Sequence, residues 1–410
     1  MLLTLLLVGS LLPTVGVPVV TLAAVGLLPI ALAALVAGMP VLHRSAGLAL
    51  LLAAVVAVPA YMTPPTTAYG ADKLQTFLML TVPSAATALV IRNRRDLTVW
   101  ATVWVASGCV LALLALVGDV DPSGRSVGAG DSNPIWLARG IGSPAVALLW
   151  LMVTRAIAVP IGLAVAGVLA AGLYVTGSRG PVVALVIATL IVLTLSSAST
   201  RVGRAAGFAL AAAVGLYVIL AFHLVPATSR LGAFLYDPRS ELDESDRIEL
   251  ARPTLDLIAS TPRGVGLGSW AEHVPIAPYW YPHNLFLEVF AEAGWLPGGI
   301  LVGTLIWVMV RLWRTTRVQP AAVLVLALLA FEVTCVSVSG DLNARSFFFI
   351  LALGYGVGWW PAPTSHRTGR SARALPSVGS VLTTPPDQRA HGVARGPHFP
   401  IRHDPSPLIR

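Results

Sequence analysis

The chain has 410 residues, of which 56% are hydrophobic and only 11% are charged, and its formal net charge is +8 at pH 7. This composition excludes an ordinary soluble globular protein, in which about a quarter of the residues are charged. Uncharged apolar runs of roughly 15–25 residues recur along the chain, and each is long enough, or nearly so, to cross a bilayer. The sequence therefore predicts an all-α, multi-pass membrane protein.

The apolar runs predict about twelve transmembrane helices in a single domain that covers residues 1–360. Residues 1–42 carry no charge, and Pro13, Gly16 and Pro18 favour a turn between two spans there. The expected spans lie near 2–14, 18–40, 46–62, 74–91, 97–117, 137–154, 156–175, 181–198, 205–225, 284–310, 319–338 and 344–360.

Arginines fall in alternate connections between these spans, at Arg44, 92–95, Arg155, 201–204 and 311–317. The positive-inside rule puts these connections and both termini in the cytoplasm, so the basic excess reports orientation and not a nucleic-acid partner. The opposite, extracytoplasmic face then holds 63–73, 118–136, 176–180, the one long loop 226–283, and 339–343. Residues 361–410 are rich in proline and arginine and predict a disordered basic cytoplasmic tail in contact with membrane lipids.

The outer turn at 176–181 carries the first candidate binding residue. Gly177, Gly180 and Pro181 favour a tight turn followed by a helix start. Arg179 lies in this turn although the positive-inside rule disfavours arginine there. Its guanidinium fits two roles, an interfacial anchor or a bidentate contact with a phosphate.

The long loop supplies two further candidates. Arg247 stands among acidic residues, so a surface salt bridge and a substrate contact are both open, and Arg252 is a second candidate. Asp246 and Glu249 have the spacing of a capping box at a helix start. Pro253 is expected to kink that helix or to begin a second one.

Two other features of the loop favour plain structural roles. The acidic stretch 237–246 is interpreted as solvated charge and not as a metal site. The three glycines within 264–268 are interpreted as a turn, since the βαβ unit that a dinucleotide-binding loop needs is not predicted around them. Cys109 and Cys335 lie in different apolar runs and are interpreted as small buried hydrophobic residues.

The end of the loop brings together the strongest candidates for chemistry. His283 precedes an apolar run in which Asn284, Glu288 and Glu292 recur every four residues and so form one polar stripe on a helix. Charges on such a stripe are costly in lipid, so the stripe is expected to face the protein interior or a wet cavity. An imidazole at this position suits a general base for a sugar hydroxyl.

Two acidic residues further along the chain add to this picture. Glu332 and Asp341 are expected either to join the same polar centre or to pair with arginine.

Taken together, these motifs resemble the O-antigen ligase/polymerase family of bacterial polysaccharide assembly. The residues that carry the resemblance are TGSRG at 176–180, SDRIEL at 245–250, STPRGVGLGSW at 260–270 and PHNLFLEVFAEAGWLPGG at 282–299, with a weaker match in SGDLN at 339–343. One departure is Ala251, where the family usually has an aromatic residue four positions after its loop arginine.

The resemblance implies a membrane glycosyltransferase with a GT-C-like fold in the cytoplasmic (inner) membrane and an extracytoplasmic active site. It implies a glycan donor on undecaprenyl pyrophosphate, a glycan or lipid-glycan acceptor, and neither a metal nor another cofactor. Family positions fall on Arg179 and Arg247 for the substrate pyrophosphate and on His283 for catalysis. Arg252, Asn284, Glu288 and Glu292 are the further expected substrate-binding residues. A ligase and a polymerase share this motif set.

Two other functions stay open from sequence. A lipid-linked oligosaccharide flippase or other transporter would use internal repeats and mid-membrane charges on several helices, whereas the polar residues here gather toward one face. A non-catalytic membrane scaffold would not need His283 or Arg179.

The arginine pattern makes a testable prediction about topology. A cysteine introduced at Ser240 should react with a membrane-impermeant maleimide added to intact cells, and one introduced at Thr315 should react only after the membrane is opened. The chain with only its native Cys109 and Cys335 sets the background labelling. The reverse pattern would contradict the orientation of every span.

Overall fold

The structure is a computed structural model of the 410-residue chain, and it describes residues 7, 40–120, 125–128, 133–196, 232, 246–276 and 278–360. The expected spans 2–14, 18–40 and 205–225 therefore lie largely or wholly outside the described residues. The same holds for the tail 361–410 and the acidic stretch before Asp246.

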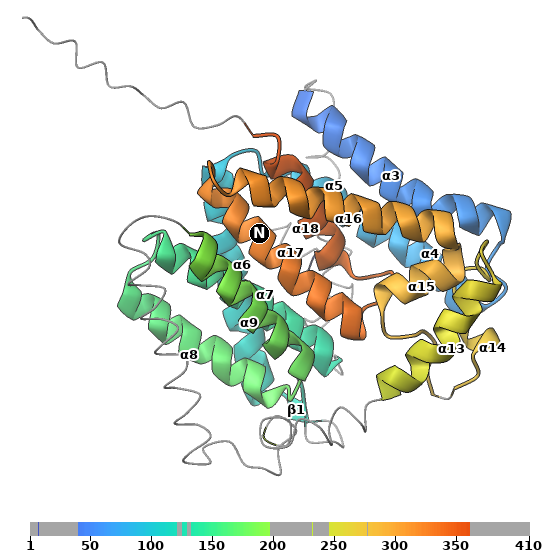
Figure 1. The fold of residues 1–410 in the computed structure, drawn as a ribbon. Coiled ribbons are helices and arrows are strands. Elements are labelled where there is room, and N and C mark those ends of the chain that lie inside the picture. The colour runs from blue at the N-terminus through green and yellow to red at the C-terminus, as the bar shows by residue number, and fades with distance from the viewer. Residues whose placement is uncertain are drawn as a thin grey trace, which may run out of the picture. The chain divides into compact units, whose positions relative to one another are not determined.

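The described residues are mostly helical (Figure 1). The first half of the chain contains α3 (Pro40–Met62), α4 (Ala68–Thr76), the π-helical segment η2 (Phe77–Thr81), α5 (Val82–Thr87), the 3-10 segment η3 (Ala88–Val90), α6 (Arg94–Val117), β1 (Asp119–Val120), β2 (Ser126–Gly128), α7 (Pro134–Val153), α8 (Val159–Val175) and α9 (Arg179–Leu195). The second half contains α13 (Asp246–Ser260), α14 (Trp270–His273), α15 (Leu285–Ala293), α16 (Trp295–Thr315), α17 (Pro320–Ser339) and α18 (Arg345–Val357). The antiparallel β1–β2 hairpin is a small departure from the predicted all-α fold.

Four of the described helices, α6, α7, α16 and α17, are long and apolar enough to cross a membrane. Shorter apolar helices lie at Leu50–Met62, Val159–Val175, Arg179–Leu195 and Arg345–Val357. The chain is therefore a multi-pass helical membrane protein, as its composition predicts. The total of twelve spans stays a prediction.

Helix α17 is the central element of the described bundle. It is buried along most of its length and packs against α7, α9, α15, α16 and α18. Its one acidic side chain, Glu332, accepts a hydrogen bond of 2.7 Å from Arg139 of α7 and one of 2.9 Å from the hydroxyl of Ser346 in α18. Glu332 therefore pairs with arginine, which was one of its two expected roles, and the pair joins three helices.

The expected single span 284–310 is wrong in one respect, because the structure divides it into α15 and α16 at Gly294. Gly294 has a φ of 97°, and a Cβ at this position would lie 2.7 Å from the backbone carbon of Arg263. The amide of Trp295 donates a hydrogen bond of 2.9 Å to the carbonyl of Pro262. Only glycine tolerates both this backbone conformation and this close approach, so α15 ends here and the 262–268 loop packs against the break.

Lys73, the only lysine in the chain, fixes α15 against α4. Its side chain is 1% exposed and forms ion pairs with Glu288 and, at 2.5 Å, with Glu292. Glu292 also accepts a hydrogen bond of 2.9 Å from the amide of Gly268. The polar stripe predicted from the sequence therefore faces the protein interior, where one cation from another helix pairs with both of its carboxylates. In Figure 1, α4 and α15 lie next to each other.

Removing Lys73 should destabilise the protein strongly. The Lys73→Met substitution leaves two carboxylates buried without their cation, and breaking a buried ion pair from one side costs about 3–5 kcal/mol. Heating the purified protein in detergent and measuring the monodisperse fraction should show a clearly lower midpoint than in the unsubstituted protein. The exposed Arg94 at the start of α6 supplies the control, Arg94→Met, whose midpoint should change little.

The same cluster distinguishes two substitutions of Glu288. Glu288→Gln keeps a polar group beside Lys73, whereas Glu288→Leu leaves the ammonium facing an apolar side chain, so the glutamine variant should give more folded protein. Equal yields would mean that polarity at this position does not matter.

Candidate functional site

The predicted turn at 176–181 is present and is pinned to the start of α7. Gly177 has a φ of 60°, as a tight turn before a helix requires. The hydroxyl of the buried Ser178 donates to the carbonyl of Pro134 at 3.1 Å, and that of Thr176 donates to the carbonyl of Leu173 at 2.7 Å. Arg179 is therefore the first residue of α9, on a backbone that has little freedom to move.

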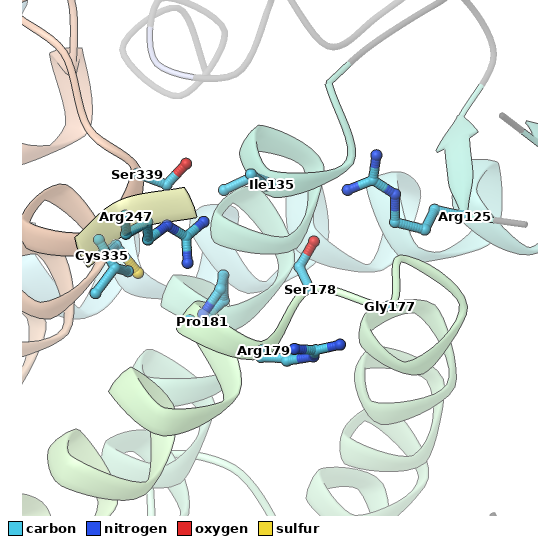
Figure 2. A pocket seen from close by; sticks show the side chains of 11 residues that line it. Arg125, Ile135, Gly177, Ser178, Arg179, Pro181, Arg247, Cys335 and Ser339 are labelled. Carbon is cyan, nitrogen blue, oxygen red and sulfur yellow. The ribbon is translucent and has the colours of Figure 1, made fainter. Parts of the chain in front are cut away.

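A cavity of about 90 Å³ opens beside this turn (Figure 2). Arg179 of α9 and Arg247 of α13 line this cavity. Arg125, the residue that directly precedes β2, lines it as well. The remaining lining residues come from three elements and the turn: Ile135, Gly177, Ser178, Gly180, Pro181, Cys335, Val338 and Ser339. The structure thus brings together Arg179 and Arg247, the two arginines that the sequence singled out from distant segments.

Arg125 also lines the cavity but was not among the site residues predicted from the sequence. The signal that could have found it is the one that pointed to Arg179, since Arg125 also lies in a connection that the positive-inside rule assigns to the outer face. Its neighbours form no recognisable motif, and only the folded chain brings it to the cavity.

Helix α13 presents Arg247 to the cavity and is one continuous helix from Asp246 to Ser260. It runs through Pro253 without starting a second helix. Its buried face packs Leu250 against Trp270, and the indole of Trp270 donates to the hydroxyl of Thr254 at 3.0 Å. The other predicted arginine of this helix, Arg252, is exposed and does not line the cavity. Its role in binding stays a prediction.

His283 is not among the residues that line this cavity in the described part of the chain. Its φ is 53°, a left-handed conformation that few residues other than glycine adopt. The ring packs 4.3 Å from that of Tyr281 and stands edge-on to that of Tyr279 at 5.2 Å between centroids. Burial raises the pKa of the Tyr281 phenol, which keeps that hydroxyl protonated. Of these two adjacent side chains, the imidazole is therefore the one suited to accept a proton near neutral pH.

Asn284 links His283 to the wall of the cavity. Its side-chain oxygen caps α15 by accepting from the amides of Phe286 and Leu287 at 3.0 and 3.1 Å. Its side-chain nitrogen donates to the carbonyl of Ser337 at 2.8 Å, and the next two residues of α17 line the cavity. Both ends of the Asn284 amide are therefore engaged in holding the backbone beside His283.

The other two residues of the stripe have structural partners as well. Glu288 and Glu292 are each 1% exposed and are held by Lys73, so the contacts described for them are with the protein itself. Their direct contact with substrate, like that of Asn284, stays a prediction.

Asp341 lies in the connection between α17 and α18 and is half-buried. Burial raises its pKa, while the positive charges of Lys73 and Arg139 oppose that rise. Its side chain accepts a hydrogen bond of 3.1 Å from the amide of Asn343. Asp341 therefore lies within electrostatic reach of both buried cations and belongs to the polar centre, the other role that the sequence left open.

The loop of three glycines is a turn, as predicted. Gly264, Gly266 and Gly268 all have a positive φ. The amides of Val265 and Gly266 donate to carbonyls at the end of α15, at 2.9 and 3.0 Å. The amides of the loop thus form hydrogen bonds with the last carbonyls of α15, which is a structural role.

These features define a class of protein, a multi-pass helical membrane protein with an arginine-lined cavity beside a fixed turn. Residues 163–302 match the sequence profile of a family described as O-antigen ligase. The matched region holds Arg179, Arg247 and His283, so it confirms the resemblance that these motifs indicated in the sequence.

Two further comparisons add little. No curated protein matches the sequence. A comparison with solved structures finds similarity to a chain from a study of the structural coordination of polymerization and crosslinking by a peptidoglycan synthase complex. The match covers 76% of this chain and 95% of that chain, with 20% sequence identity and a TM-score of 0.40. A likeness of this size supports no statement about substrate or mechanism.

Proposed function

We propose that the protein is a membrane glycosyltransferase. It would transfer or polymerise glycan from an undecaprenyl-pyrophosphate-linked donor onto a sugar hydroxyl of a glycan or lipid-glycan acceptor, at the outer face of the cytoplasmic membrane. The observation that carries this proposal is the meeting of Arg179 and Arg247 in one cavity, within the region that matches the O-antigen ligase family.

The proposed reaction replaces one bond to the donor sugar with another. The bond between the sugar's anomeric carbon and the pyrophosphate oxygen breaks, and the pyrophosphate leaves with the electron pair. The acceptor hydroxyl oxygen bonds to the same carbon and gives up its proton to His283. Guanidinium groups in the cavity would offset the negative charge that builds up on the departing pyrophosphate.

The positions of the residues suit this division of labour. The donor pyrophosphate would lie in the arginine-lined cavity, and its sugar would extend toward the end of α17. Asn284 holds the His283 backbone to that same helix end through the Ser337 carbonyl. In this arrangement Asn284, Glu288 and Glu292 serve as positioning residues for His283.

The arginine role predicts a loss of activity with a defined pattern. Arg179→Ala and Arg247→Ala should each lower transfer from a polyprenyl-pyrophosphate glycan by about 10²–10³-fold, the range for removing one donor to developing charge. Arg179→Lys should also lose much activity, because it keeps the charge but loses the planar fork. Arg252→Ala should be milder, since that side chain does not line the cavity.

The measurement is the yield of new glycosidic bonds with purified protein in vesicles. Arg95→Ala, at the exposed start of α6, is the matched control and should transfer normally. Full activity of Arg179→Ala at normal protein level would rule out the phosphate role of this residue.

His283 separates catalysis from binding. His283→Ala should leave donor binding nearly intact and slow bond formation by about 10²–10⁴-fold, the usual contribution of a general base. In the unsubstituted protein the rate should fall as the pH drops through the range in which an imidazole takes up a proton. Substituting His43, on the expected cytoplasmic side, should change neither quantity.

Binding and bond formation are therefore measured side by side. Normal bond formation by His283→Ala would end the base assignment, and equal losses of binding and turnover would make His283 a donor ligand. A flippase would move the lipid-linked glycan without forming a new glycosidic bond in any variant, so the same assay also tests that alternative.

A further inference from the structure

Aromatic side chains gather around His283, and one of them is open to solvent. Tyr279 and Tyr281 contact the imidazole, whereas Trp280, which lies between them in the chain, packs against Tyr69 of α4 at 5.8 Å between ring centroids. The Trp280 side chain is 61% exposed. Three residues of fully extended chain span at most about 10–11 Å, so the exposed indole is attached within that distance of His283.

Tyr69, the ring on which this indole packs, is held in place by the backbone around it. It lies in the first turn of α4, which Thr67 caps by accepting a hydrogen bond of 3.0 Å from the amide of Gly70. A Cβ at Gly268 would lie 3.2 Å from a carbon of the Tyr69 ring, so the glycine loop packs closely on it. The ammonium of the buried Lys73 lies 5.6 Å from the centroid of the same ring. The aromatic pair is therefore largely preorganised before any ligand binds.

The surroundings of the pair suit a sugar better than a lipid chain. The described exposed positions within 63–68 and 272–278 hold only threonine, proline, alanine, glutamate and histidine. By contrast Trp313, which is 51% exposed, lies on α16 on a surface that also exposes Ile306 and Val310, as expected for a helix in lipid. A sugar ring has an apolar C–H face that fits an aromatic ring and hydroxyls that fit polar neighbours.

We propose that Trp280, supported by Tyr69, forms a binding subsite for the sugar ring of the acceptor. This inference rests on the proposed function, in which His283 takes the proton of the acceptor hydroxyl. The acceptor sugar must then lie at the imidazole, and Trp280 is the exposed aromatic residue attached closest to it in the chain. The donor pyrophosphate is assigned to the arginine-lined cavity, and Trp280 is not among the described residues that line that cavity.

A stacking contact with the acceptor ring would act on binding and not on the chemical step. The ring is held in the same way in the bound substrate and in the transition state, and uniform binding of this kind lowers KM without raising kcat. Loss of the indole should therefore raise the KM for the acceptor and leave kcat nearly unchanged. His283→Ala is expected to have the opposite pattern.

The test compares Trp280→Leu, Trp280→Phe and the control Trp313→Leu in the purified full-length protein. The donor is a polyprenyl-pyrophosphate glycan at fixed concentration, and the varied acceptor is the free glycan released from that donor by mild acid. Trp280→Leu should raise the acceptor KM about tenfold, or about 1.4 kcal/mol, a size within the range for one aromatic contact. Trp280→Phe should raise it less than about threefold because phenylalanine keeps a flat face. Trp313→Leu should match the unsubstituted protein.

Binding of the same free glycan supplies a second measurement that does not depend on turnover. Equilibrium dialysis with labelled glycan should give saturable binding to the unsubstituted protein and about tenfold weaker binding to Trp280→Leu. Binding of the lipid-linked donor should be equal in the two proteins. A tryptophan that only contacts lipid would tolerate leucine and phenylalanine alike, since both are apolar.

The outcomes distinguish this inference from the proposed function. An unchanged acceptor KM in Trp280→Leu, no saturable binding of the free glycan, or equal losses in Trp280→Leu and Trp313→Leu would overturn the acceptor subsite. Weaker binding of the donor alone would also overturn it, because the indole would then hold the donor. Normal transfer by Arg179→Ala and His283→Ala would instead contradict the proposed function, whatever the result at Trp280.

Discussion

The ion pairs between Lys73 and the two glutamates of α15 are the interaction on which the geometry of this region depends. A buried charge without a partner is too costly to persist, so α4 and α15 must lie together wherever Lys73 is buried. Glu292 extends the constraint to the glycine loop through the amide of Gly268. Because α15 is fixed, its N-terminal cap at Asn284 and the adjoining His283 are fixed too. A buried charge cluster thus helps to determine where the candidate base lies.

The end of α17 joins the two halves of the candidate site. Its last turn lines the arginine cavity, and the carbonyl of Ser337 receives the amide of Asn284. Further down the same helix, Glu332 binds Arg139 and holds α7, whose N-terminal residue Pro134 in turn receives the hydroxyl of Ser178. The turn that carries Arg179 and the backbone at His283 are therefore both held in place, directly or through α7, by α17. This arrangement suits a reaction that needs a leaving group and a proton acceptor at fixed separation.

The charged residues singled out at and near the candidate site follow two patterns. Lys73, Arg139 and Glu332 are almost completely buried and meet an opposite charge at short distance, as a low-dielectric interior requires. Arg125, Arg179 and Arg247 are partly or largely exposed and line a cavity. The first pattern stabilises the helix bundle, and the second is the one expected of a site for an anion that binds and leaves. The same residue type, arginine, therefore has different roles according to its depth.

The sequence by itself determined the class of protein, most of the described helices, the turn before Arg179 and the inward face of the glutamate stripe. These features depend on hydrophobic length, turn chemistry and helical spacing, which are local. Only the tertiary structure decided that Lys73 pairs with the stripe, that Gly294 divides the expected span 284–310, and that Arg125 joins Arg179 and Arg247. Each of these depends on contacts between segments far apart in the chain, and a local pattern carries no information about which distant segment will supply the partner.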